Sequence, residues 1–108
     1  MAGTLYVVAT PIGNLEDLTP RAARILRKVD LIAAENSAVA RKLLQHIGVS
    51  HRPTLYNDRT RARTSNRLLT ALAAGQSAAL ICDAGTPGLS DPGQDLVRLA
   101  REAGVTVV

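Results

Sequence analysis

Short apolar runs alternate with longer amphipathic segments along this chain, and that alternation restricts the folds open to it. The runs at 4–9 and 78–81 are mostly aliphatic and lack helical periodicity, which is typical of strands buried on both faces. In the segments between such runs, apolar residues recur every three to four positions, as on one face of a helix. A strand followed by a helix, repeated, predicts a parallel sheet with right-handed crossovers. We therefore expect an α/β fold with a mostly parallel sheet of about five strands flanked by helices.

The residues that begin and end helices set the expected boundaries. Thr19 is a suitable N-cap with Pro20 at the first helical position, and Asn36 or Ser37 caps the next helix. A third helix is expected from about Thr60 to Ala74 and a fourth after Gly93. Expected helix ends are Gly48, Gly75 and Gly104, and the expected strands are 4–9, 30–35, 54–56, 78–81 and 105–108.

The composition is that of one folded domain that almost lacks aromatic residues. The chain has 108 residues, of which 46% are hydrophobic and 20% charged, so it can bury a core and is not of the disordered class. Its aromatic residues are two tyrosines, and it has no Phe or Trp. The core must therefore be aliphatic, and stacking of bases on aromatic side chains is not expected as a main mode of recognition.

The single cysteine, Cys82, excludes a disulfide within this chain. Its position at the end of an apolar run favours a small buried thiol over a nucleophile. No signal segment opens the sequence, and no apolar stretch approaches the length that spans a bilayer. These features predict a cytoplasmic protein without membrane contact. His46 and His51 belong to no cluster of ligating residues, so no metal site is predicted.

The segment Leu80–Gly93 (LICDAGTPGLSDPG) predicts a ligand-binding loop. Directly after an apolar run it holds three glycines, which can adopt positive φ, and two prolines, which fix φ. A simple turn does not require so many residues of these two types. In open α/β sheets, ligands bind outside the carboxyl ends of strands, where glycines let them approach the backbone. The alternative is a plain connection in which Ser90 or Asp91 caps the following helix, and the two roles are compatible.

Positive charge is concentrated in the middle of the sequence. The chain has a formal net charge of +4, and residues 41–67 carry seven Lys and Arg against Asp58 alone. Such a distribution favours binding of a polyanion through its phosphates, the alternative being a solvated helix face. Arginines also crowd the start of the third helix, against its dipole, which hints at a bound phosphate or a frayed helix start.

Two motifs resemble those of a known family. They are Leu5–Thr19 (LYVVATPIGNLEDLT) and Asp83–Gly93 (DAGTPGLSDPG), and their order and spacing are similar to those of the bacterial ribosomal RNA small subunit methyltransferase I family of the tetrapyrrole methylase superfamily. The resemblance covers nearly the whole chain. It implies a single amino-terminal α/β domain over 1–108, followed in the intact protein by a second α/β domain that completes a cofactor cleft and is absent from this chain.

The resemblance implies an enzyme that transfers a methyl group from S-adenosylmethionine to the ribose 2′-hydroxyl of a cytidine in small-subunit ribosomal RNA. The isolated fragment is expected to be inactive, and the intact protein is expected to form a homodimer that acts on the RNA or the 30S subunit. The matching positions for the cofactor, among which Thr86 and Leu89 are the strongest candidates, are Ile12, Asp83, Ala84, Gly85, Thr86, Pro87, Gly88 and Leu89.

The chemistry of this reaction asks mainly for alignment of nucleophile, methyl and leaving sulfur. A ribose hydroxyl is a poor nucleophile, so a general base or an oriented water would help, and Glu16, Asp17 and Glu35 are candidates. Asn14 can orient the ribose by hydrogen bonds. Each acid also has a structural alternative: Glu16 and Asp17 favour the dipole of the first helix, and Glu35 can cap the second.

The candidate RNA contacts are exposed cations that phosphates could neutralise, with solvation as the alternative. They are Arg21, Arg41, Lys42, Arg59, Arg61 and Arg63. Two segments depart from the family pattern. Where that family usually has Ala-Glu-Asp-Thr-Arg-His-Thr, this chain has Ala34–Ala40 (AENSAVA), and Asn57–Arg61 (NDRTR) replaces an acidic, histidine-rich run. Two rival functions stay open, a C-methyltransferase of tetrapyrroles and a non-catalytic RNA-binding module.

Overall fold

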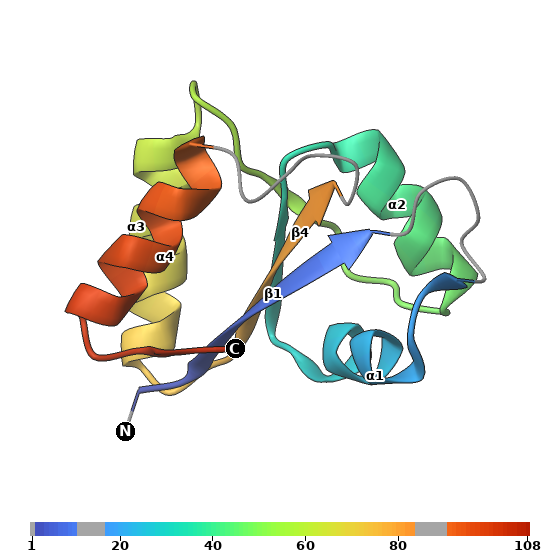
Figure 1. Cartoon of the computed structure of the whole chain (residues 1–108), viewed down its shortest axis with the longest axis horizontal. Coiled ribbons are helices and arrows are strands. Elements are labelled where there is room, and N and C mark those ends of the chain that lie inside the picture. The colour runs from blue at the N-terminus through green and yellow to red at the C-terminus, as the bar shows by residue number, and fades with distance from the viewer. Residues whose placement is uncertain (1, 11–16, 84–90) are drawn as a thin grey trace.

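Within residues 2–10, 17–83 and 91–108, which the computed structural model describes, five parallel strands form one sheet in the order β3-β2-β4-β1-β5 (Figure 1). The strands are β1 (Thr4–Thr10), β2 (Leu31–Ala34), β3 (Thr54–Leu55), β4 (Ala78–Asp83) and β5 (Thr106–Val107). The helices are α1 (Pro20–Lys28), α2 (Ser37–His46), α3 (Arg61–Ala73) and α4 (Asp91–Glu102). The predicted α/β class and parallel sheet are confirmed.

The helices cover the two faces of the sheet in pairs. Helices α1 and α2 lie on one side, and α3 and α4 lie on the other (Figure 1). Because successive side chains of a strand point to opposite faces, Ala79 and Ile81 of β4 pack with α1 and α2, whereas Leu80 packs with α3 and α4. Both cores are mainly aliphatic, as the composition requires. Tyr56 is buried in the core under α3 and α4, and Tyr6 packs against the core under α1 and α2.

The expected caps form at α1 and α2. Thr19 Oγ1 accepts a hydrogen bond from the backbone N–H of Ala22 at 3.1 Å, and Pro20 begins the helix. Asn36 Oδ1 accepts from the N–H groups of Ala38 and Val39 at 3.1 and 3.2 Å. Asn36 is therefore the cap of α2, and the structural alternative that gave this role to Glu35 is wrong.

Several boundaries differ from the expected ones. Strand β4 continues two residues past Ile81, because its backbone pairs with β1 as far as Asp83. Asp91 is already the first helical residue of α4, so it does not stand before the helix as a cap; Ser90 lies outside the described residues. Glycines 48, 75 and 104 have φ of 75°, 93° and 80°, the left-handed conformation that ends a helix.

We predict that Asn36→Ala lowers the free energy of unfolding by about 1 kcal/mol, because two N–H groups of the first turn of α2 lose their acceptor. Urea denaturation followed by circular dichroism measures this. The matched control is Asn36→Asp, which keeps the acceptor and adds a charge favourable to the dipole, so it should be as stable as the original. Equal losses in both variants would contradict the capping role.

Candidate functional site at the carboxyl edge of the sheet

The neighbouring strands β1 and β4 lead to opposite faces of the sheet. The chain passes from β1 to α1 on one face and from β4 to α4 on the other, although β1 and β4 are hydrogen-bonded along their length (Figure 1). Such a point, at which the direction of the connections reverses, opens a crevice at the carboxyl ends of the two strands. It is the site that open α/β sheets use for ligands.

Strands β1 and β4 end at the same level, beyond the end of β2. Thr10 pairs with Asp83 at the end of the β1–β4 ladder. Strand β2 ends at Ala34, opposite Ile81, two residues before Asp83. The carboxyl edge therefore steps down from β1 and β4 toward β2, and Glu35, the residue that follows β2, lies beside this step.

The two predicted ligand segments begin at this switch point. Ile12, Asn14 and Glu16 follow β1, and residues 84–89 follow β4; all lie outside the described residues. The backbone of Asp83 is described, as the last residue of β4. The switch point thus brings together the starts of segments that are more than seventy positions apart in the sequence, and their roles in binding stay predictions.

The two candidate acids in the described part of the chain lie beside different strands. Glu35 follows β2 directly and is half-buried, with its N–H 3.5 Å from the carbonyl oxygen of Ile81. Asp17 is exposed in the turn before Thr19. Glu35 is therefore the less exposed of the two carboxylates.

Tyr56, which follows β3, has a fully buried side chain at the same edge. Its backbone N–H donates to the carbonyl oxygen of Ala34 at 2.8 Å, and its hydroxyl lies 3.2 Å from Ser65 Oγ in α3. Burial raises the pKa of the Tyr56 phenol, the Ser65 hydrogen bond opposes that rise, and the charge of Asp95 reinforces it. The phenol is therefore neutral at physiological pH. Apart from the rarity of aromatic residues, nothing in the sequence points to this buried contact between Tyr56 and Ser65.

A hydrogen-bonded corner connects β3 to α3. Thr60 and Thr64 both donate their hydroxyls to the carbonyl oxygen of Leu55, at 2.9 and 3.1 Å. Asn57 Oδ1 accepts from the N–H groups of Arg59 and Thr60 at 3.0 and 3.1 Å. The corner is fixed by side-chain contacts, so the arginines that follow project from a defined backbone.

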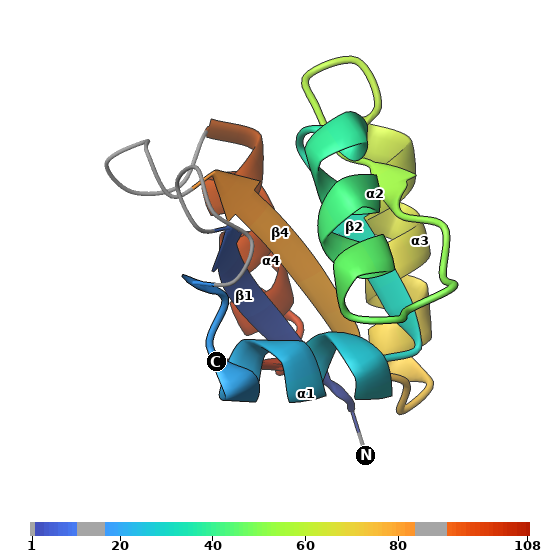
Figure 2. The same ribbon diagram turned by 90° about the vertical axis from the view of Figure 1, so that its right-hand side faces the viewer.

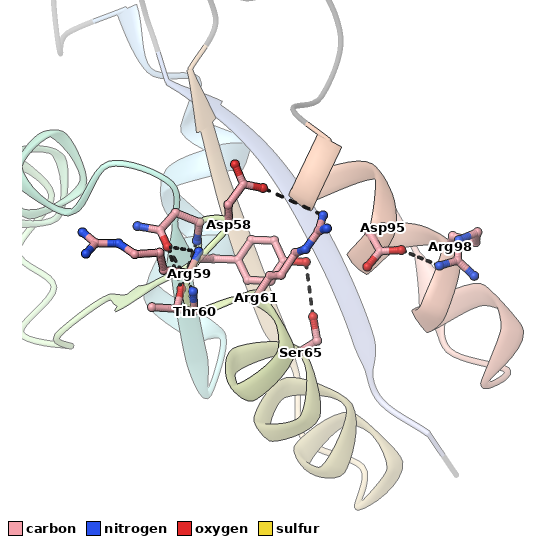
Figure 3. Close-up of polar contacts among 9 residues, drawn as sticks. Asp58, Arg59, Thr60, Arg61, Ser65, Asp95 and Arg98 are labelled. Carbon is pink, nitrogen blue, oxygen red and sulfur yellow. Dashed lines mark hydrogen bonds and ion pairs between the residues drawn. The ribbon is translucent and has the colours of Figure 1, made fainter.

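An acidic residue, Asp58, lies near the positive charges at the start of α3. Arg61 Nη1 lies 3.9 Å from Asp58 Oδ1, an exposed and weak ion pair that reduces the conflict with the helix dipole. Figure 3 shows Arg61 reaching toward α4, between Asp58 and Asp95. Arg61 and Asp95 also line a cavity of about 450 Å³ with Gln94 and Arg98, whose guanidinium is bound to Asp95 and Glu102.

The predicted RNA contacts do not gather into one patch. Arg21, Arg41 and Lys42 are exposed on α1 and α2, whereas Arg61 and Arg63 are on α3, across the sheet. Arg59 is exposed just before α3. One flat RNA surface therefore cannot contact all six cations. Their positions in the sequence alone do not show which of them lie on the same side of the sheet.

Two further expectations concern metals and membranes. Among the described residues, no group of three or more His, Cys, Asp and Glu side chains is arranged to hold a metal ion. In the same ranges, no helix is long and apolar enough to cross a membrane.

The predicted burial of Cys82 is confirmed, with 6% of the residue exposed.

Comparison with known proteins identifies the family. The family model described as Tetrapyrrole (Corrin/Porphyrin) Methylases matches residues 4–108. The chain belongs to the tetrapyrrole methylase family. The membership in this superfamily that the two motifs indicated is thereby confirmed.

Curated relatives narrow the similarity within the tetrapyrrole methylases. Over 106 residues the chain is 53% identical to the ribosomal RNA small subunit methyltransferase I of Synechocystis sp. and 50% identical to that of Escherichia coli O157:H7, covering 98% of this chain in both cases. The matches cover 38% and 37% of those proteins. The chain thus spans less than two fifths of the length of the relatives it matches.

Solved structures show the same fold at low sequence identity. Uroporphyrin-III-C-methyltransferase from Thermus thermophilus superposes with a TM-score of 0.74 at 23% identity, covering 99% of this chain and 46% of that one. Diphthine synthase superposes with a TM-score of 0.75 at 17% identity, covering 97% and 42%. These likenesses support the architecture alone.

We predict that Tyr56→Phe lowers the free energy of unfolding by about 1 kcal/mol at pH 7, because the contact with Ser65 is lost. The pKa of the Tyr56 phenol is raised in the folded state, which makes the free energy of unfolding depend on pH. The unfolded chain releases the phenol proton first, so stability should fall as the pH rises above about 10, and Tyr56→Phe should lack that part of the fall.

Urea unfolding at pH 7 and pH 10.5 tests both parts. Tyr6→Phe is the matched control, since it removes a phenol hydroxyl from the opposite face and leaves Tyr56 in place. The same alkaline loss of stability in the original protein and in Tyr56→Phe would refute the assignment.

Proposed function

We propose that the intact protein transfers a methyl group from S-adenosylmethionine to the ribose 2′-hydroxyl of a cytidine in small-subunit ribosomal RNA. The observation that carries the proposal is the 53% identity, over 98% of this chain, to a relative named for methylation of that RNA. The β1–β4 switch point agrees with it, since both segments that the motif match assigns to the cofactor start there.

The residues at the switch point suit a cofactor of this kind. Ala9 of β1 and Cys82 of β4, both with small side chains, are paired one position before the two strands end. The contacts proposed for the cofactor are Ile12, Asp83 and residues 84–89, in which Gly85 and Gly88 allow close approach of a ligand to the backbone. When bound, the cofactor supplies a sulfonium-activated methyl group, and the protein's task is alignment.

The substrate hydroxyl needs orientation and help with its proton. We assign Asn14 to hydrogen-bond the ribose, and Glu35 or Asp17 to accept the proton directly or through a water. Glu35 is half-buried beside the end of β2, which favours it over the exposed Asp17. Cations at the edge, including Arg59 and Arg61, then neutralise phosphates on either side of the target.

The proposal includes the rest of the protein. A second α/β domain is expected to close the crevice, so residues 1–108 alone should not transfer methyl groups. We also propose that the intact protein is a homodimer acting on the 30S subunit in the cytoplasm. A protein that acts on so large a polyanion needs contacts beyond the reacting nucleotide, as the exposed cations of this chain suggest.

A second candidate is methylation of a tetrapyrrole at carbon. The description of the matching family favours it, and a tetrapyrrole also carries carboxylates that arginines can bind. The high identity to relatives named for RNA methylation favours the first candidate. A third reading, RNA binding without catalysis, applies to this chain when it is separated from the rest of the protein.

Incubation of the intact protein with labelled S-adenosylmethionine and unmodified 30S subunits should place the label in ribosomal RNA. Hydrolysis of that RNA in alkali should leave the label in a dinucleotide, because a methylated 2′-oxygen cannot attack the adjacent phosphate. A tetrapyrrole precursor is the competing substrate. Label in the tetrapyrrole, or in mononucleotides only, would overturn ribose methylation.

Thr86→Val in the intact protein should weaken S-adenosylmethionine binding roughly tenfold, the cost of one lost hydrogen bond in a covered site. Isothermal titration calorimetry measures the dissociation constant. The control is Thr70→Val, a substitution at an exposed position of α3 away from the carboxyl edge. Unchanged affinity in Thr86→Val would remove Thr86 from the cofactor contacts.

A further inference from the structure

A notch of about 410 Å³ lies between helix α2 and the segment that follows it. Its polar lining consists of Arg41 and Gln45 from the helix and of Ser50, His51 and Arg52 from the segment. Its apolar lining consists of Leu44, Val49 and Pro53. Every polar side chain in the lining can donate a hydrogen bond, and two of them are permanent cations. We call this cavity the α2 notch.

The α2 notch has no acidic side chain in its lining, and residues 36–53 contain no Asp or Glu. In the part of the chain that the structure describes, neither Arg41 nor Arg52 takes part in an ion pair. The cavity between α3 and α4 is different, because Asp95 lines it and binds Arg98 there. The α2 notch therefore offers uncompensated positive charge to a ligand.

The same face of the molecule continues the positive charge along α1. Residues 18–29 also lack acids, and Arg21, Arg24 and Lys28 line a second cavity of about 370 Å³ beside Tyr6. Arg27 Nε donates to the carbonyl oxygen of Ile47 at 3.0 Å, which fixes α1 to the end of α2. Figure 2 faces this side of the molecule, with α1 and α2 in front of the sheet.

We propose that the α2 notch binds phosphate groups of the RNA backbone, outside the crevice in which the reaction takes place. Its volume is in the range of sites that hold a small organic ligand, so a phosphate fits together with its ribose. Arg41 and Arg52 form charge-assisted hydrogen bonds to the phosphate oxygens, and the side chains of Gln45, Ser50 and His51 supply further hydrogen-bond donors. This inference rests on the proposed function, because it presupposes an RNA substrate.

The test compares two double variants of the intact protein. Arg41→Gln with Arg52→Gln removes both notch cations, and Arg67→Gln with Arg101→Gln removes two exposed arginines from α3 and α4, on the other side of the sheet. All four side chains are exposed, and glutamine has nearly the helix propensity of arginine, so both variants should fold. Binding to naked small-subunit RNA and to 30S subunits is measured over a range of salt concentrations.

The notch variant should bind RNA roughly tenfold more weakly than the control variant, and the slope of log affinity against log salt should fall by about 1 to 2 in magnitude. Methyl transfer at saturating 30S subunits should keep its kcat while KM rises, because the notch binds the substrate away from the reacting atoms. This combination supports the inference.

The remaining outcomes separate the inference from the proposed function. If the original protein methylates RNA and both variants bind RNA equally well, the notch assignment is wrong and the proposed function stands. If affinity falls for 30S subunits but not for naked RNA, the notch binds a ribosomal protein and the RNA assignment is wrong. If the original protein neither binds nor methylates RNA, both proposals fail.

Discussion

The pairing of β1 with β4 is the constraint on which the rest of the structure depends. The ladder runs in register from Leu5 opposite Ala78 to Thr10 opposite Asp83, so both strands end at one level. A slip of one residue would turn Leu80 away from α3 and α4 and expose it to the other layer. The register thus fixes the two cores and the crevice together, because the same strands supply the buried side chains and the starts of both predicted ligand segments.

Local chemistry allowed much of this fold to be predicted from sequence. The caps Thr19 and Asn36 and the turn at Gly48 depend on residues within a few positions of one another, so their types and spacing suffice. Asn36 illustrates why a departure from the family pattern leaves α2 intact, since asparagine caps a helix as aspartate does. The end of β4 was harder to predict, because Cys82 and Asp83 extend the strand only through pairing with β1.

The site was less predictable where it depends on which residues meet across the fold. The six candidate RNA contacts have similar sequence surroundings, yet the sheet places Arg41 and Arg63 on opposite sides. The sequence does not show that His51 and Arg52 lie beside Arg41 in the α2 notch, because only folding brings the segment after α2 back against that helix. The contact between Tyr56 and Ser65 is hidden in the sequence for the same reason, because it follows no periodic pattern and depends on the corner at Thr60.

The placement of the two tyrosines gives this chain a built-in pair of optical reporters. Tyr6 packs against the core under α1 and α2, and Tyr56 is buried in the core under α3 and α4. With no Trp or Phe in the chain, its near-ultraviolet circular dichroism comes from these two rings alone. Removing one phenol ring at a time therefore separates the signals of the two layers, so that loosening of one layer can be followed while the other stays packed.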